Sequence, residues 1–407
     1  MRYLLVNQFY PPDLAPTGRY LHDLARALVA AGHSVTVVCS RAAYGGGGRY
    51  PAREVRDGVS VRRVPAHSLG RESTAGRLSG YVLFLPLALA ALLRPPRPDL
   101  ILALTTPPYL GFVAKIAARL RGVGHAHWVM DVYPDALVAH SWLRTGSLFT
   151  RLLERLARFQ FGGARRVVGL GPFMVERLRA YCRPDTTLES LALWAPEHVG
   201  ASDGARLRAE RGWAPGDLVL MYAGNMGLGH RFGEFLEAAA RLGPNGPVWA
   251  FVGGGARRVE VEAARGTQPA ARIQLLPYVD DDRLPESLAS ADVHLASLSR
   301  DWQGVIVPSK IQAIFAAGRP VLFVGPRENE IASWIEQSGA GWIVPEGDVD
   351  ALLGVVAAAR DPAERARRGQ AAQAFATEHF SLEGNGRRLV ELLVLSAQGA
   401  PSPPQRR

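Results

Sequence analysis

The sequence predicts an α/β protein built from two doubly wound domains that face each other across a cleft. Short apolar segments typical of buried strands alternate along most of the chain with longer segments that have the apolar spacing of helices. The 407 residues are too many for a single hydrophobic core. Hydrophobic residues make up 48% of them, which supplies two cores and argues against disorder.

The first domain opens with a strand–helix–strand unit. Residues 3–6 form an apolar strand, residues 18–31 a helix and residues 34–39 a second strand. Gly18 stands at the start of the helix, where free backbone N–H groups favour an anion. Prolines in the preceding turn exclude the glycine pattern of a dinucleotide fold, so a phosphate contact here requires another loop geometry.

Two helical segments of this half are candidates for contact with a membrane. The apolar run of residues 80–93 contains Pro86 and is shorter than the roughly 20 residues that span a bilayer. It fits either a core helix or a helix lying in a membrane surface. Residues 147–161 form a basic amphipathic helix. The arginines beside the apolar run would suit anionic headgroups: Arg77, Arg94 and Arg97.

Polar residues follow the next predicted strands. Thr105 and Thr106 come directly after one apolar strand, and Asp131 follows the next strand, which contains His127. Because the carboxyl ends of parallel strands face the ligand in an open sheet, all four are candidate site residues. A histidine in such a strand is more often a core imidazole, and Asp131 could equally cap the following helix.

The second domain contains two patterns that could cradle a phosphate. In the first, an apolar strand over residues 218–223 runs into Gly224, Gly227 and Gly229 before a helix. No carboxylate follows at the distance where a dinucleotide fold binds the ribose.

The second pattern is a loop, short helix and strand over residues 301–325. Ser309 is a candidate N-cap, and Lys310 adds a positive charge at the start of the helix. Alone, this layout fits an ordinary helix–strand unit with a surface lysine as well as it fits a phosphate site.

Charge and cysteine content narrow the classes of partner. A net charge of +10 indicates an anionic partner, such as nucleic acid, phospholipid or a diphosphate. Nucleic acid is the least favoured, because the arginines are scattered and lack stacking aromatic residues. Cys39 and Cys182 have no metal-ligand spacing, so we expect core thiols in a reducing cytoplasm and no metal site. The apolar N-terminus is too short for a signal peptide.

A set of short motifs, taken in their order along the chain, indicates one particular kind of protein. They are Pro11-Pro12 with Thr17-Gly18, 32-GHSVTVV-38, 222-YAGNMG-227, 251-FVGGG-255, 276-LPYV-279, 291-ADVHL-295 and 308-PSKIQAIFAAGRPV-321. Together they resemble retaining GT-B glycosyltransferases of the GT4 type, above all bacterial sugar transferases that build O-antigen, capsule and exopolysaccharide.

The resemblance covers roughly residues 1–390 and implies a division of the chain. An acceptor-side domain over residues 1–195 precedes a nucleotide-sugar-binding domain over 196–375. A C-terminal helix over 376–395 crosses back to the first domain, and the composition of 396–407 is that of a disordered tail.

The resemblance also assigns roles in binding and catalysis. Lys310 neutralises the leaving diphosphate in place of a metal, with Arg231 as a neighbouring basic group. Asp131, with His127 as second choice, lies near the donor sugar. The remaining donor-binding positions are Thr17, Gly18, Gly224, Asn225, Gly227, Tyr278, Val279, Gly304, Val305, Ile306, Ser309 and Gln312.

One motif departs from the family pattern. Many members carry two glutamates eight positions apart, one contacting the sugar and the other the ribose, and here these positions are Gly304 and Gln312. Gln312 can still hydrogen-bond a ribose hydroxyl, as a neutral partner. The motif version resembles a subgroup that does not keep both glutamates, so the loss does not imply inactivity.

The resemblance implies transfer of a sugar, expected from a UDP-linked donor, to a polyprenyl-diphosphate-linked glycan. The protein would act without a cofactor, in the cytoplasm, bound peripherally to the anionic inner face of the membrane. Two alternatives share the fold: a UDP-sugar 2-epimerase and a non-catalytic membrane-docked partner protein.

Overall fold

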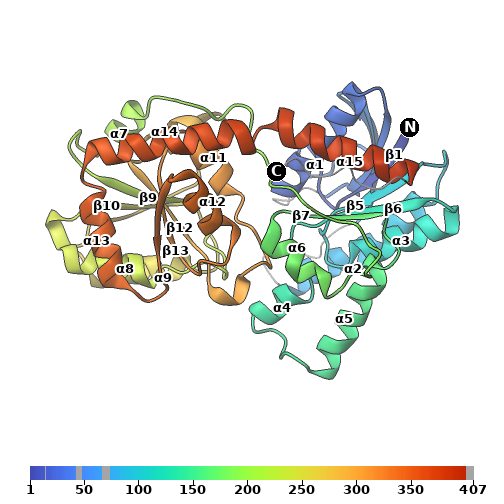
Figure 1. The fold of residues 1–407 in the computed structure, drawn as a ribbon, viewed down its shortest axis with the longest axis horizontal. Helices are drawn as coiled ribbons and strands as arrows, with labels where there is room; N and C mark the ends of the chain where they lie inside the picture. The colour runs from blue at the N-terminus through green and yellow to red at the C-terminus, as the bar shows by residue number, and fades with distance from the viewer. Residues whose placement is uncertain (14, 43–47, 67–73, 400–407) are drawn as a thin grey trace. The chain divides into compact units, whose positions relative to one another are not determined.

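The computed structural model describes residues 1–13, 15–42, 48–66 and 74–399. They form two compact units (Figure 1). Unit 1 contains Met1–Ala192, Gly304–Ile306 and the chain from Glu383 onward, and unit 2 contains Leu193–Gln303 and Val307–Leu382.

Unit 1 is built on an eight-stranded sheet that is parallel except for one edge. Its strands, in spatial order, are β3 (Arg53–Arg56), β4 (Val59–Val64), β2 (Ser34–Ser40), β1 (Arg2–Val6), β5 (Leu100–Ala103), β6 (Gly124–Trp128), β7 (Arg166–Gly169) and β8 (Leu188–Ser190). Only β3 runs antiparallel to its neighbour. The central strands are buried along nearly their whole length, because helices cover both faces.

Two layers of helices enclose this sheet (Figure 1). On one face α1 (Pro16–Ala30) packs against α15 (Arg387–Gln398). On the other, α3 (Leu110–Arg121) lies between α2 (Thr74–Leu92) and α5 (Leu148–Phe161). Two further helices follow the carboxyl ends of β6 and β7: α4 (Asp135–Ala139) and α6 (Pro172–Arg179).

Unit 2 has a six-stranded sheet that is parallel throughout. Its strand order is β11 (Ile273–Leu276), β10 (Val248–Val252), β9 (Val219–Ala223), β12 (Val293–Ser297), β13 (Val321–Val324) and β14 (Gly341–Val344). Its helices are α7 (Ala205–Glu210), α8 (Gly233–Leu242), α9 (Arg258–Thr267), α10 (Leu284–Ala289), α11 (Lys310–Ala316), α12 (Glu330–Ser338), α13 (Val349–Ala358) and α14 (Pro362–His379).

Both sheets are doubly wound, which confirms the predicted fold class. In each, the first strand lies in the middle, and the chain moves outward first on one side and then on the other. The direction reverses between β1 and β5 in unit 1 and between β9 and β12 in unit 2. Loops at the carboxyl ends of these strands are the places where such sheets bind ligands.

The C-terminal region differs from the prediction. The helix expected over residues 376–395 is instead the end of α14, a short π-helix over Leu382–Gly386, and then α15 in unit 1. Arg165 and Arg166 fasten α15, because they donate hydrogen bonds to the carbonyl and hydroxyl of Ser396 at 2.6 and 2.9 Å. The tail predicted from residue 396 therefore begins as helix, and residues 400–407 lie outside the described residues.

The apolar segment over residues 80–93 is partly buried in the core and partly exposed. Phe84, Ala88 and Leu92 of α2 are buried in the core of unit 1, whereas Val82 and Leu83 are 65% and 41% exposed. No helix among the described residues is long and apolar enough to cross a membrane. The side chain of Arg77 lies outside the described part of the structure.

Candidate functional site

Lys310 lies at the point in unit 2 where the strand order reverses. It is the first residue of α11, and its ammonium lies 3.4 Å from the centre of the Tyr222 ring at the end of β9. Nζ is buried and has no hydrogen-bond partner. Burial holds the pKa of Lys310 well below its usual value. A desolvated amine without an acceptor is a group that an anionic ligand would satisfy.

Lysine is a rare residue in this protein, so its presence at position 310 is notable. The sequence contains only two lysines, Lys115 and Lys310, among 47 basic Lys and Arg residues. Lys115 is occupied, because it donates a hydrogen bond of 2.5 Å to the Phe159 carbonyl. Unlike arginine, a lysine can lose its proton when buried, so position 310 holds a group whose charge can respond to a ligand.

Glycines shape the turn beside this lysine. Gly224 has a φ of +127°, and a side chain there would point at Nζ and Cε of Lys310, each 3.9 Å from its Cβ. Gly253 and Gly255, after β10, also have positive φ. A Cβ on Gly253 would lie 2.3 Å from the Gly224 carbonyl oxygen, so the two turns can meet only as glycines. The result is a backbone-lined surface at the carboxyl end of the sheet.

Arg231 lies at the same end of the sheet but is already paired. Its guanidinium donates to Glu234 at 2.6 Å and lies 3.6 Å from Glu346. Its backbone N–H donates to the Ser297 hydroxyl at the end of β12. These two carboxylates partly neutralise the positive charge of Arg231, so its attraction for an anionic ligand is reduced.

Other predicted donor positions line this edge. The exposed ring of Tyr278 lies against Gly253 and Gly254, and its hydroxyl donates to the Gly254 carbonyl at 3.4 Å. Val279 is half-buried beside it, and Asn225 is exposed in the turn after β9. Gly227 belongs to the same turn, where a Cβ would lie 3.1 Å from the Asn225 amide nitrogen.

One of the two predictions about α11 needs correction. Ser309 precedes the helix but makes no capping hydrogen bond, so it is not an N-cap in the usual sense. Gln312 is completely buried, and neither its amide oxygen nor its amide nitrogen has a hydrogen-bond partner. A ribose contact by Gln312 therefore requires the surroundings of α11 to open toward the ligand.

In unit 1, Asp131 follows β6 at the carboxyl edge of the sheet. The Thr105 hydroxyl, at the end of β5, accepts hydrogen bonds from the backbone N–H groups of Met130 and Asp131 at 3.1 and 3.3 Å. These bonds tie the Asp131 backbone to the end of the neighbouring strand β5. Burial raises the pKa of the Asp131 carboxyl to about 6. An acid poised near neutrality is typical of a functional position.

The segment Gly304–Ile306 packs against unit 1. Ile306 forms a β-bridge with Asp131, and the Val305 carbonyl accepts a hydrogen bond of 3.0 Å from the Val132 N–H. Gly304 has a φ of +66°, and a Cβ there would lie 2.7 Å from the Phe173 carbonyl oxygen. Position 304 therefore excludes a glutamate in this backbone conformation, which gives a physical reason for the departure from the family pattern.

His127 is a core residue and not part of the candidate site. It is 2% exposed, its Nε2 donates to the Gln160 carbonyl at 3.1 Å, and its ring packs on Phe161. Burial, with the neighbouring His125, holds the pKa of His127 well below its usual value. The assignment of His127 as an alternative catalytic group stays a prediction, and this packing gives it no support.

The start of α1 is also less open than predicted. The helix begins at Pro16, and the Gly18 N–H donates to the Ala15 carbonyl at 2.9 Å, so this amide is not free for a phosphate. Gly18 allows the helix to approach the Phe9 backbone, which lies 3.2 Å from where its Cβ would be. Thr17 accepts a hydrogen bond from the Asn7 amide at 3.2 Å.

The structure thus brings the predicted residues together in two groups, one per unit. In the described part of the chain, no group of three or more His, Cys, Asp or Glu side chains could hold a metal ion. The sequence reading missed Tyr222, whose ring holds Lys310. Its position two residues before Gly224, at the end of a buried strand, was the available signal.

Comparisons with known proteins match the two halves of the chain to two domain models. Residues 17–194 match the model of the glycosyl transferase 4-like domain, and residues 217–359 match that of glycosyl transferases group 1. The glycosyltransferase WbjE of Pseudomonas aeruginosa is 28% identical over 64% of this chain and 66% of its own. The colanic acid biosynthesis glycosyl transferase WcaI of Escherichia coli is 23% identical over 87% of this chain and 90% of its own.

Solved structures share the fold at lower identity. Sucrose-phosphate synthase of Thermosynechococcus elongatus has a TM-score of 0.77 and 16% identity, covering 97% of this chain and 98% of its own. HepE of Anabaena, solved in complex with UDP-glucose, has a TM-score of 0.71 and 15% identity, covering 97% and 99%. These likenesses show that the chain shares the two-domain fold of these structures.

Proposed function

Because the chain belongs to the GT-B glycosyltransferases, we propose that it moves a sugar, with retention of configuration, from a nucleotide-diphosphate donor to a polyprenyl-diphosphate-linked glycan. The reaction would serve surface polysaccharide biosynthesis, as the name of the relative WcaI suggests. We propose a UDP-sugar as donor, since the similar fold of HepE was solved with UDP-glucose. The enzyme would work peripherally at the cytoplasmic face of the membrane.

The observation that carries this proposal is the unpaired ammonium of Lys310. Nζ is buried beside the glycine turn of residues 224–229, at the strand-order reversal of unit 2. A diphosphate bound over this turn would give the amine its acceptor. The positive charge of Lys310 would also stabilise the negative charge that builds up on the diphosphate as its bond to the sugar breaks. The exposed ring of Tyr278 offers a stacking surface for the base.

The chemistry needs no metal and no covalent intermediate in this proposal. The acceptor oxygen forms a bond to the anomeric carbon on the face from which the diphosphate departs. The bond from that carbon to the phosphate oxygen breaks, and the same oxygen takes the proton of the acceptor hydroxyl. Lys310 would compensate the charge on the departing diphosphate, and Asp131 would orient the sugar.

Product analysis tests the proposal. The protein is incubated with a UDP-sugar in the presence and absence of a polyprenyl-diphosphate glycan, and the products are resolved by mass spectrometry and NMR. The proposal predicts free UDP and a lengthened glycan with the donor's anomeric configuration, both only when acceptor is present. An altered sugar without acceptor would identify a 2-epimerase. Nucleotide-sugar binding without any product would identify a non-catalytic partner.

A further inference from the structure

Helix α5 of unit 1 has an apolar stripe on its outward face. Its buried side consists of Thr150, Ala157, Gln160 and Phe161. At about 3.6 residues per turn, Leu148, Leu152 and Phe159 fall on the opposite side. They are 86%, 50% and 43% exposed, and Phe149 beside them is 57% exposed. A surface helix normally presents polar residues there, so this stripe requires an explanation.

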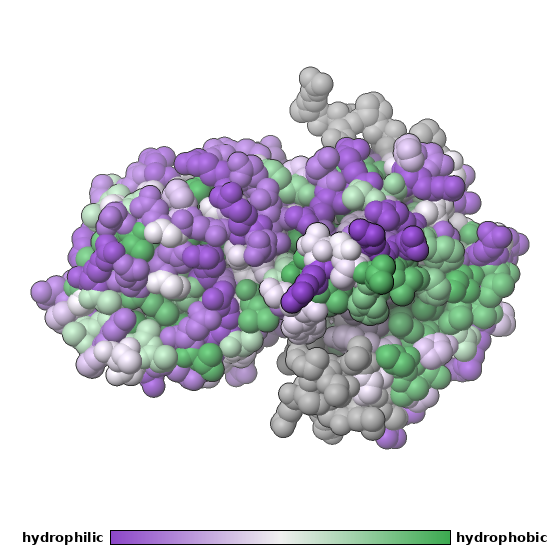
Figure 2. Space-filling view, turned by 90° about the horizontal axis from the view of Figure 1, so that it is seen from below, coloured by the Kyte–Doolittle hydropathy of each residue, from purple (hydrophilic) through white to green (hydrophobic). Residues whose placement is uncertain are grey.

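The connection that precedes the helix also exposes a large apolar side chain. Trp142, 58% exposed, stacks on His140 with ring centroids 4.8 Å apart. At the far end, Lys115 covers part of the Phe159 ring at 4.1 Å. The open part of the stripe is therefore its N-terminal end: Trp142, Leu148, Phe149 and Leu152. Figure 2 shows hydrophobic side chains gathered over a broad area of this unit, with polar residues beside them.

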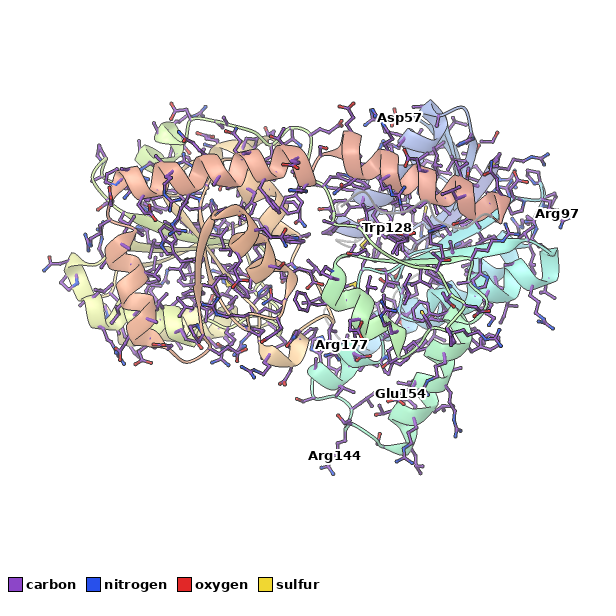
Figure 3. All side chains as sticks on the ribbon, viewed as in Figure 1. Asp57, Arg97, Trp128, Arg144, Glu154 and Arg177 are labelled. Atoms are coloured by element: carbon purple, nitrogen blue, oxygen red, sulfur yellow. The ribbon has the colours of Figure 1, made fainter. Side chains whose placement is uncertain are left out.

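Arginines border this end of the helix. Arg144, Arg151 and Arg155 are exposed, and Figure 3 shows Arg144 on the connection between α4 and α5. Glu154 is the one acidic residue between Ala136 and Phe161, and it lies 3.6 Å from Arg158. The apolar stripe thus has a border of positive charge. Leu, Phe and Trp on one side with arginines on the flanks are typical of a helix that lies in a lipid interface.

We propose that the N-terminal half of α5, together with Trp142, inserts into the surface of an anionic lipid bilayer. Leu148, Phe149 and Leu152 would enter the boundary between headgroups and acyl chains, while Arg144, Arg151 and Arg155 contact lipid phosphates. On the same face of the sheet, beyond α3, α2 also has two exposed apolar side chains, Val82 and Leu83. This surface would bring unit 1 to the membrane in which the lipid-linked acceptor lies. That biological purpose rests on the proposed function.

Vesicle binding tests the surface without donor or acceptor. The full chain is sedimented with phosphatidylcholine vesicles that contain or lack phosphatidylglycerol. We expect binding to the anionic vesicles that weakens as salt rises. Replacing Leu148→Ser, Phe149→Ser and Leu152→Ser together should reduce partitioning by about 100-fold. Val55→Ser with Val259→Ser, two side chains that are 75% and 62% exposed elsewhere, is the matched control and should bind normally.

A second pair of variants separates charge from apolar insertion. Arg151→Gln with Arg155→Gln should weaken binding to anionic vesicles by about 30-fold. The exposed pair Arg53→Gln with Arg265→Gln should have little effect. All of these side chains are exposed, so unchanged thermal unfolding is expected and would show that the variants fold.

Three results would overturn the proposal. They are no binding of the parent protein to anionic vesicles, equal binding of the serine variant, and a dimer in solution that the serine variant converts to a monomer. The last result would identify a second copy of the chain as the occupant. Failure of the proposed function is distinguishable, because vesicle binding would then persist while sugar transfer to a water-soluble acceptor analogue is absent.

Discussion

Replacing Gln312 by methionine should stabilise unit 2. The side chain is completely buried, and both polar atoms of its amide lack partners. Methionine has nearly the same length and no polar group to desolvate. Since a buried unsatisfied polar group costs about 1–3 kcal/mol, we expect Gln312→Met to raise the unfolding free energy by that amount. For a unit of this size the melting temperature should rise by roughly 2–10 °C.

The same variant tests whether Gln312 binds the donor. If its amide hydrogen-bonds the ribose, Gln312→Met should weaken UDP binding by about 5-fold, the worth of one neutral hydrogen bond. Thermal unfolding with and without UDP measures both effects. Gln337→Met, on the exposed side of α12, is the control and should change neither. A fall in the melting temperature of Gln312→Met would refute the reasoning, because it would mean that the amide is satisfied in the folded protein.

Two further predictions concern unit 1. Because the pKa of Asp131 is raised from 3.8 to about 6, the folded state holds an extra proton between those values, and stability falls as pH rises through that window. Asp131→Asn should therefore raise the unfolding free energy at neutral pH by up to about 3 kcal/mol and leave it unchanged near pH 3. A difference in unfolding free energy between the two proteins that does not change with pH would contradict this. Gly304→Ala should destabilise the protein by about 1–3 kcal/mol more than Gly212→Ala, as measured by chemical unfolding. Gly212 is the control because it also has a positive φ but has no neighbour within 4 Å of a Cβ placed there. Equal effects of the two substitutions would show that the contact with Phe173 is unimportant.

Much of the fold follows from local patterns in the sequence. The strand before Gly224 and the helix after it were predictable, because an apolar run that ends in glycines can continue as neither helix nor strand. The helix predicted over residues 147–161 is α5, which begins after the cap Ser147. Its hydrogen bond to the Thr150 N–H satisfies a free amide of the first turn.

The features that could not be predicted from the sequence depend on contacts between residues that are far apart in the chain. Periodicity shows that α5 has leucines between arginines, but it does not tell which leucines face the core, so the outward position of Leu152 appears only in the structure. The burial of Gln312 depends on which side of α11 is packed. Gly304 joins unit 1 through Phe173, a residue more than a hundred positions earlier in the chain.

The central claim is that Lys310 binds the donor diphosphate. Loss of a charged hydrogen bond of about 1.5–3 kcal/mol predicts that Lys310→Met weakens UDP binding by roughly 10- to 150-fold. The fold should be unchanged, because the variant removes a buried amine that has no hydrogen-bond partner and keeps an apolar side chain beside the Tyr222 ring. Lys115→Met, which changes the other lysine, should bind UDP normally.

Isothermal titration of the parent protein and of these two variants with UDP is therefore the most direct measurement. We expect tight binding of UDP to the parent protein and to Lys115→Met, and a loss of affinity of 10-fold or more with Lys310→Met. Equal affinity of all three proteins for UDP would contradict it.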